Sequence, residues 1–482
     1  MKRTIILAAT AALALTVPAG TGAQGQRAPR GISPAEARQG AAAHPQLLDE
    51  YGGSYGGPQD GYVARIGQRI AIQSGLPDAG SAIRVTLLNA PVNNAFAVPG
   101  GYVYVTRQLL ALMNDEAELA AVLGHEVGHV AARHGASRSR ASTFGTLGAV
   151  LVGVLTGSSA ATQLAGQAAQ LVTLRYSRSQ EYESDDLGVR YLAGAGYDPA
   201  AMGRVLASLA AQGALDARLA GRPAQQLPSF ASTHPDPGSR VARALSRARQ
   251  YPAAGREQGR DAFLAALDGM VYGDDPRQGV IDGQAFLHPE LRLAFRAPPG
   301  FQLTNGTRAV SIAGPGGQAQ FAGAPFAGDL QAYVERVFAG LSQNGRIAAG
   351  GWRRGRVNGL ETLSATARAA GQQGALDVSV TAYAFAPDRA YHVLTIVPAG
   401  QGIGPFLPLI DSVRRLSAEE AARIPVREID IVTVRPGDTP QRLAQNMAFD
   451  DARLDRFLVL NGLAANAVLR PGDRVKLVVY RR

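Results

Sequence analysis

Residues 125–129 of this 482-residue chain read H-E-x-x-H, a set of residue types whose spacing suits metal chemistry. On a helix, His125 and His129 lie about 40° apart around the axis, so both imidazoles leave one face and can hold one ion. Glu126 can reach a water on that ion without being a ligand itself. The pattern predicts a zinc peptidase site with Glu126 as general base. Chance placement of two of the seven histidines is the less favoured alternative.

The segment that carries the motif, 114–134, has the local features of a helix. Asp115 and Glu118 form a capping-box pair at its start. An apolar stripe follows at helical spacing, made of Leu119, Val122, Leu123, Val127 and Val130. The motif is therefore expected on a helix.

Two strands, 83–88 and 102–106, are expected just ahead of this helix. One reading is that they wall a substrate cleft, where a free edge can pair with an extended peptide. The other is an ordinary hairpin, and the residues favour neither.

A catalytic zinc needs three protein ligands and an open position for water. The chain has no cysteine, so the third ligand must be His, Glu or Asp. Glu181 and Asp185 lie four apart within a predicted helix, 163–192, and share one face. One can bind the metal while the other accepts a hydrogen bond from a ligand imidazole. Glu183 lies about 200° from Glu181 around that helix, so both cannot face the metal.

These two motifs, H-E-x-x-H at 125–129 and E-x-x-S-D at 181–185, resemble those of the HtpX and CAAX-protease family of gluzincin peptidases. The likeness is to its exported BepA-like and Oma-type branch and covers about residues 63–249. The family pattern has Ala where this chain has Ser184. The resemblance implies one Zn²⁺ per chain, peptide-bond hydrolysis and a mainly helical zincin-type domain. Its ligands would be His125, His129 and Glu181, with Asp185 and Arg240 as supporting residues.

Histidines outside the motif are interpreted separately. In BepA-like relatives the His of a T-H-P loop lies near the zinc and can occupy its open position. The matching residue here is His234, which either does the same or is an ordinary loop histidine. His134 lies about 140° around the helix from His129 and is expected to be structural.

Composition limits the other function classes. Hydrophobic residues at 46% and charged residues at 18% indicate a globular chain. The net charge of +10 comes from dispersed arginines without a basic block, which argues against nucleic acid and for a weak preference for anionic surfaces. The apolar run at 144–155 is too short to span a bilayer. A buried helix is the favoured reading, and a peripheral membrane contact is the alternative.

The chain is expected to be an α+β multidomain protein. Residues 1–23 read as a secretory signal peptide, so a periplasmic or otherwise exported protein is expected. The remaining divisions are a flexible arm at 24–45, a peptidase domain at 46–272, an α+β accessory domain at 273–420 and a small βααβ domain at 430–482.

The last division resembles a LysM domain, through the segments 432–439, 460–463 and 469–473. That resemblance implies binding to N-acetylglucosamine polymers such as peptidoglycan. The whole chain is interpreted as an exported zinc endopeptidase that cleaves misfolded or stalled envelope proteins near the cell wall. The alternatives are a wall-associated binding or chaperone protein with an idle site, and a peptidoglycan-acting metalloenzyme.

Overall fold

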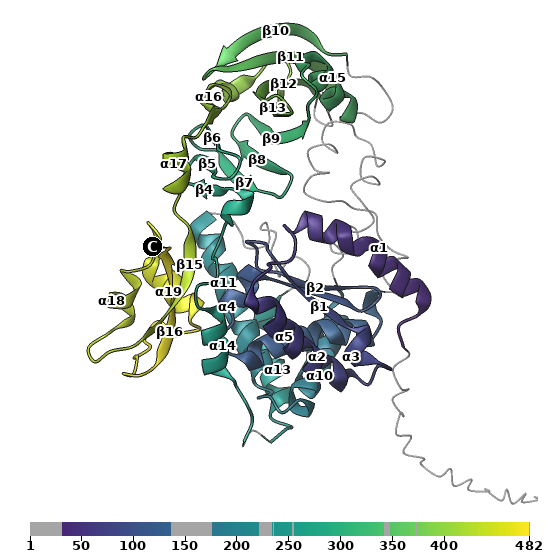
Figure 1. Ribbon diagram of the computed structural model, residues 1–482. Coiled ribbons are helices and arrows are strands. Elements are labelled where there is room, and N and C mark those ends of the chain that lie inside the picture. The colour runs from purple at the N-terminus through teal and green to yellow at the C-terminus, as the bar shows by residue number, and fades with distance from the viewer. Residues whose placement is uncertain are drawn as a thin grey trace, which may run out of the picture.

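The computed structural model describes residues 31–135, 176–220, 234, 236–252, 255–341, 348–371 and 374–481. The expected signal peptide and the apolar run at 144–155 lie outside these residues. Figure 1 shows a helix-rich part below, a sheet-rich part above it and a small C-terminal part at the side. The predicted α+β multidomain fold is confirmed. Within the described ranges no helix is long and apolar enough to cross a membrane.

The helix-rich part surrounds a three-stranded sheet. Its strands are β1 (Arg84–Leu88), β2 (Ala95–Val98) and β3 (Tyr102–Thr106), in the order β1-β3-β2. The central strand, β3, pairs parallel with β1 and antiparallel with β2. The sheet is therefore not the simple hairpin that two strands would make. The helices are α1 (Pro34–Glu50), α2 (Pro58–Ala71), α3 (Ala79–Ala82), α4 (Arg107–Leu112), α5 (Glu116–Ala131), α10 (Arg178–Gly194), α11 (Ala201–Ala220), α13 (Pro237–Ala248) and α14 (Arg260–Leu267).

The H-E-x-x-H motif lies on α5, which is buried on every side from Ala117 to His129. Asp115 caps the helix by accepting the Glu118 N–H at 2.8 Å. The Glu118 carboxylate in turn accepts the Asn114 N–H at 2.9 Å, one residue earlier than in the standard capping box. A helix so enclosed holds its side chains in place through packing.

Small residues let α5 and α10 approach closely. A Cβ added at Gly128 would lie 3.2 Å from the Ser184 carbonyl oxygen, and one at Gly124 would lie 3.3 Å from the Gly188 Cα. Larger side chains at these positions would push the helices apart. The close approach brings the acidic residues of α10 beside the histidines of α5.

Residues 34–45 correct the expectation of a flexible arm, because they belong to α1. Ser33 and Glu36 form a full capping box at its start. The helix buries Gly40, Ala43 and Leu47 against the sheet. A Cβ at Gly40 would lie 2.2 Å from the Pro99 carbonyl oxygen, so this contact requires glycine. Such small buried residues give a weak apolar period, which explains the error.

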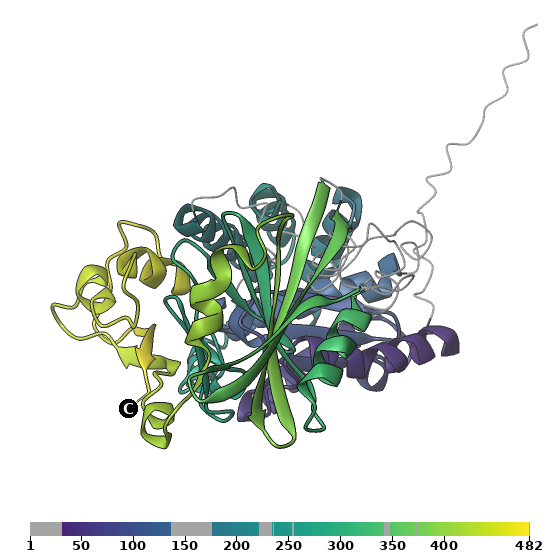
Figure 2. The same ribbon diagram turned by 90° about the horizontal axis from the view of Figure 1, so that it is seen from above.

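The sheet-rich part contains two antiparallel sheets (Figure 2). The larger has the strand order β10-β11-β12-β13-β9-β8-β7, and the smaller has the order β14-β6-β5-β4. The helix α15 (Leu330–Gly340) packs on β11 and β12 around Tyr333 and Phe338. The strands are β4 (Val280–Asp282), β5 (Ala285–His288), β6 (Leu293–Arg296), β7 (Gln302–Asn305), β8 (Ala309–Gly314), β9 (Gly317–Pro325), β10 (Gly350–Val357), β11 (Leu360–Gly371), β12 (Gly374–Ala386), β13 (Arg389–Pro398) and β14 (Arg414–Arg415); the other helices are α16 (Leu407–Ser412) and α17 (Ala418–Ala422).

The C-terminal part consists of β15 (Arg427–Thr433), α18 (Pro440–Ala444), α19 (Arg453–Leu460) and β16 (Arg474–Tyr480), with the two strands antiparallel. It is not a loosely attached tail, because its apolar residues belong to the same hydrophobic cluster as those of α2, α4 and α5. The backbone also continues this contact, since Ile429 exchanges hydrogen bonds with the segment at Gly269 and Met270.

Lys476 of β16 anchors this contact. Its side chain is fully buried and its Nζ donates to the carbonyl oxygens of Ala111 and Met113, at 2.8 and 2.5 Å. Burial lowers the pKa of Lys476 and raises that of Glu118, each to about 7, while the opposite charges of the two groups favour their ionised forms. One lysine of the C-terminal part thus ties down the junction between α4 and α5.

We expect Lys476→Met to destabilise the helix-rich part together with the C-terminal part. Removing the buried donor leaves the Ala111 and Met113 carbonyls unsatisfied, and each buried unsatisfied acceptor costs about 1–3 kcal/mol. Urea unfolding followed by far-ultraviolet circular dichroism measures the change. The exposed Arg442→Met serves as control. A loss below about 1 kcal/mol, the size of an ordinary surface effect, would contradict the anchoring role.

Candidate metal centre

Four side chains that can bind a metal meet inside the helix-rich part. They are His125, His129, Glu181 and His234, and one donor atom from each lies within 4.8 Å of all the others. All four are at most 2% exposed. The histidines of the H-E-x-x-H motif come from α5 and Glu181 comes from α10, while His234 lies just ahead of α13.

The spacing of the donor atoms fits a tetrahedral zinc ion. Bonds of about 2.0–2.1 Å imply ligand atoms about 3.3 Å apart. The Nε2 atoms of His125 and His129 are 3.0 Å apart, and each lies 3.6 Å from an oxygen of Glu181. The charges also fit, since three buried carboxylates (Glu126, Glu181 and Asp185) face the single guanidinium of Arg240. A divalent cation would balance them.

Asp185 holds the first histidine in the ligand orientation. Its Oδ1 lies 2.9 Å from Nδ1 of His125, which leaves Nε2 of that ring directed at the cluster. Burial alone would raise the pKa of Asp185, but hydrogen bonds from Arg240 and His125 lower it to about 2. Burial would lower the pKa of His125, and the hydrogen bond to Asp185 with the charge of Glu181 raises it instead. Asp185 is thus an ionised carboxylate that accepts a hydrogen bond from the Nδ1–H of His125.

Arg240 of α13 fastens both acidic residues of α10. Its Nε and NH2 donate to the two Asp185 oxygens at 2.7 and 2.6 Å, and its NH1 lies 2.5 Å from Oε2 of Glu181. A planar guanidinium suits this forked contact, and the side chain is only 2% exposed. Arg240 therefore fixes the positions of Glu181 and Asp185, and its NH2 also lies 3.4 Å from Nδ1 of His125.

His129 is held by aromatic and histidine neighbours. The Tyr176 ring stacks on its imidazole with 3.6 Å between centroids and 14° between planes. Tyr176 lies directly ahead of Ser177, which caps α10, so the same turn that starts α10 places the tyrosine. Sequence analysis missed Tyr176, although its place five residues before Glu181 is a usable signal. His134, expected to be structural, has its Nδ1 2.8 Å from Nδ1 of His129.

Glu126 and His234 lie at the remaining side of the cluster. Nδ1 of His234 is 3.2 Å from Nε2 of His125 and 3.0 Å from Oε1 of Glu181. Its Nε2 is 3.5 Å from Oε1 of Glu126. The His234 ring therefore stands between the glutamate and the metal-binding atoms. Most of the loop that carries it, 227–235, lies outside the described residues.

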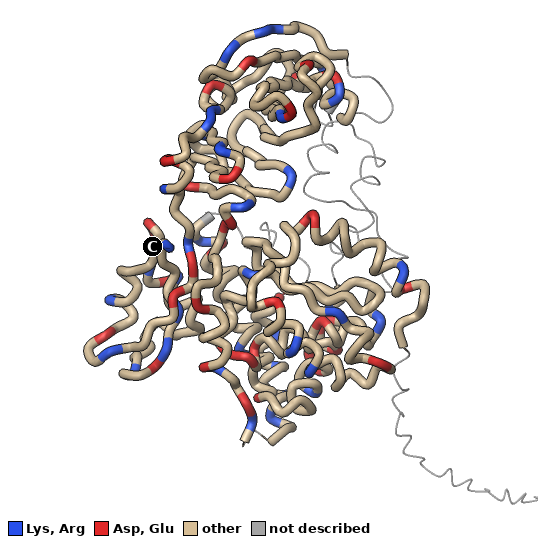
Figure 3. The backbone as a smooth tube through the Cα atoms, viewed as in Figure 1, with Lys and Arg blue, Asp and Glu red and all other residues tan. Residues whose placement is uncertain are grey.

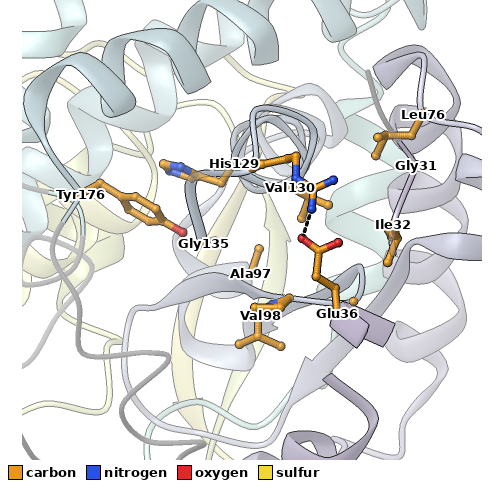
Figure 4. Close-up of a pocket in the computed structure, with 13 residues that line it drawn as sticks. Gly31, Ile32, Glu36, Leu76, Ala97, Val98, His129, Val130, Gly135 and Tyr176 are labelled. Atoms are coloured by element: carbon orange, nitrogen blue, oxygen red, sulfur yellow. Dashed lines mark hydrogen bonds and ion pairs between the residues drawn. The ribbon is translucent and has the colours of Figure 1, made fainter. Parts of the chain in front are cut away.

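A pocket opens beside His129, as Figure 4 shows. It is lined by Ala97 and Val98 of β2 and by Tyr176, among others. The Glu36–Arg133 ion pair closes it on the side of α1. The pocket thus lies between the metal-binding atoms and an outer strand of the sheet.

The fold and this cluster define the class as a metal-dependent peptidase domain, in which two helices supply two histidines and two glutamates to one buried site. Residues 58–248 match the model for Peptidase family M48, and residues 432–478 match the model for the LysM domain. The chain therefore contains an M48 metallopeptidase domain, whose family metal is zinc, and a C-terminal LysM domain. Both resemblances stated from the sequence are confirmed.

Curated relatives are similar over the peptidase domain. The chain is 31% identical over 213 residues to the "Beta-barrel assembly-enhancing protease" of Escherichia coli (strain K12), covering 42% of each chain. It is 32% identical over 216 residues to the "Mitochondrial metalloendopeptidase OMA1" of Schizosaccharomyces pombe, covering 43% of this chain and 59% of the relative. The chain thus spans about half the length of these relatives.

Proposed function

We propose that the chain is an exported zinc endopeptidase that cleaves misfolded or stalled envelope proteins. The observation that carries the proposal is the cluster of His125, His129 and Glu181, with spacing that suits zinc and Glu126 beside it. Asp185 and Arg240 are proposed as the residues that orient the ligands.

The chemistry divides between the ion and the chain. A zinc ion in such a site lowers the pKa of a water at its open position and polarises the scissile carbonyl. Glu126, buried beside the cluster, accepts the proton from the attacking water and passes it to the leaving amine. Hydrolysis then needs no other acid or base from the chain.

The sheet offers a place for a peptide. Among the strands of the described residues, β2 pairs only with β3, and its residues line the pocket beside His129. An extended segment added along β2 would run past the metal-binding atoms. Only an unfolded stretch can take that conformation, which favours misfolded or stalled proteins as substrates. The assembly-enhancing function named for the E. coli relative supports an envelope role, although only part of each chain aligns.

We expect Glu126→Gln to retain zinc and to lower peptidase activity by about 10²–10⁴-fold, because the amide keeps the shape of the side chain but cannot take a proton. Casein cleavage and zinc content of the purified protein measure the two effects. Glu257→Gln, exposed and remote from the cluster, is the matched control.

If the Glu126→Gln variant cleaved casein at the wild-type rate, Glu126 would have no part in the mechanism. Zinc binding without any proteolysis by the wild-type chain would favour the idle binding or chaperone protein, and digestion of sacculi would favour a peptidoglycan-acting enzyme.

His234 is proposed as a plug for the open metal position. Its Nδ1 is within 3.2 Å of atoms from two proposed ligands, and its Nε2 faces Glu126. In this arrangement the ring occupies the space that water and the carbonyl of a substrate would need. The metal position would then open only when the His234 ring leaves this place.

We expect His234→Ala to raise basal casein cleavage by roughly tenfold, which corresponds to about 1.4 kcal/mol in favour of the closed arrangement. His44→Ala controls for the loss of a histidine elsewhere, because His44 lies in α1 and forms a hydrogen bond with Tyr104 of β3. Unchanged or lower activity with full zinc content would count against a plug.

We further propose that the LysM domain holds the enzyme near peptidoglycan. The domain packs through α19 against the helix-rich part, and a hollow beside α18 is lined by Arg435, Arg442 and Asn446, among others. Polar and basic side chains suit a glycan polymer with acidic peptide stems.

We expect the full chain carrying Glu126→Gln to sediment with purified sacculi and Arg442→Ala to weaken this binding several-fold. Sedimentation is compared with and without sacculi at fixed salt, because a charge contact weakens as salt rises. Failure of the full chain to sediment would leave the LysM domain as a packing element only.

A further inference from the structure

The two histidines of the H-E-x-x-H motif are supported differently. His125 has a buried carboxylate, Asp185, on the nitrogen that faces away from the cluster. His129 has another histidine there, since its Nδ1 lies 2.8 Å from Nδ1 of His134. His134 is 5% exposed, and its Nε2 lies 3.2 Å from Oε2 of Glu183. A line of three side chains thus runs from the cluster to the surface of α10.

A break in helical geometry makes this contact possible. The helix α5 ends at Ala131, and Arg133 has a positive φ of 58°. A non-glycine residue in this region turns the chain sharply and costs of order 1 kcal/mol or more. Here the turn folds His134 back onto the last turn of α5. The Arg133 side chain, paired with Glu36 of α1, holds the turn in place.

The order of protons along the line follows from chemistry. A histidine that offers Nε2 to a metal carries its proton on Nδ1, so His129 donates. His134 must then accept with its own Nδ1, which puts its proton on Nε2, directed at Glu183. The Oε2 atom of Glu183 accepts a hydrogen bond from that N–H. In this arrangement both rings are neutral, and the Ser184 hydroxyl, whose Oγ lies 3.4 Å from Nδ1 of His134, can donate to the same nitrogen.

We propose that His134 and Glu183 form a positioning relay that holds His129 in the tautomer and orientation required for zinc. The proposal rests on the proposed zinc peptidase function and deepens it. Neither residue touches the reacting atoms, so both are positioning residues. The relay is the counterpart, for the second histidine, of the Asp185–Arg240 pair on the first.

The two members of the relay should differ in importance. His134 is buried and makes the direct contact with Nδ1 of His129, so its loss removes a buried acceptor from that nitrogen. The Glu183 side chain is 60% exposed, so water can replace much of its contribution. Removing a partner of this kind from a metal ligand typically weakens metal binding by about 10–100-fold.

Three variants of the full chain separate the relay from simple packing. His134→Leu keeps the bulk and removes the acceptor. His134→Asn places an amide oxygen near the position of Nδ1 and so keeps an acceptor for His129. Glu183→Gln keeps the shape and removes the charge, with Glu257→Gln as control, since that glutamate is similarly exposed at 57%.

Zinc affinity is measured by competition with a chromophoric chelator, and ligand geometry by the visible spectrum of the Co²⁺-substituted protein. We expect His134→Leu to weaken zinc binding by about 10–100-fold and to change the Co²⁺ spectrum. We expect His134→Asn to stay within about threefold of wild type with a wild-type spectrum, and Glu183→Gln to lose a few-fold. These readouts do not depend on peptidase activity.

The relay is overturned if folded His134→Leu binds zinc as tightly as wild type, or if His134→Asn loses as much affinity as His134→Leu. If His134→Leu does not fold, wild-type-like affinity of His134→Asn with weakened Glu183→Gln supports the relay, and any other pattern overturns it. A wild-type chain that binds no zinc would instead overturn the proposed function.

Discussion

The close packing of α5 against α10 is the contact on which the site depends. Gly124 and Gly128 on one helix meet Gly188 and Ser184 on the other so closely that an added Cβ would lie only 3.2–3.3 Å from backbone atoms of the facing helix. Glu181 and Asp185 occupy the same buried face of α10 as Ser184. The small residues therefore set the distance between the histidines and the carboxylates, and the donor atoms come within zinc-binding reach because the backbones do. The serine that departs from the family pattern is still small enough for this contact.

Charge burial explains why several elements must enclose that contact. Glu126, Glu181 and Asp185 are at most 1% exposed, and ionised carboxylates in such surroundings need partners. Arg240 of α13 pairs with Glu181 and Asp185, and the histidines with a bound ion would supply the remaining partners. At the opposite end of α5, Lys476 of the LysM domain donates to the Met113 carbonyl, and its charge lowers the pKa of Glu118 against the effect of burial. Figure 3 shows charged residues spread over all three parts of the described chain. By contrast, the ion pairs of Arg240 are buried within the helix-rich part, and the contacts of Lys476 are buried where that part meets the LysM domain.

Sequence spacing could predict which residues share a helix face, but not which faces meet. H-E-x-x-H placed His125 and His129 together, and E-x-x-S-D did the same for Glu181 and Asp185, yet the choice between those two acids needed a family resemblance. His134 was expected about 140° away from His129 because the helix was extended through it; the left-handed Arg133 reverses the chain instead. The helix α1 was missed for another reason. Its buried residues are mostly small, and its contacts are close approaches that composition does not reveal.

The position of α1 connects these local errors to the site. Glu36 of α1 pairs with Arg133, the residue whose positive φ returns His134 to His129. The same pair lines the pocket beside β2, so one ion pair borders the place proposed for a peptide and lies next to the turn that carries His134. Its two side chains are 21% and 36% exposed, so the charge attraction alone contributes little. The ion pair instead fixes where the left-handed turn at Arg133 lies relative to α1. The helix α1 in turn packs closely on the β2–β3 hairpin through Gly40 and Gly100. The helix α1 therefore packs as part of the helix-rich part that holds the metal-binding residues.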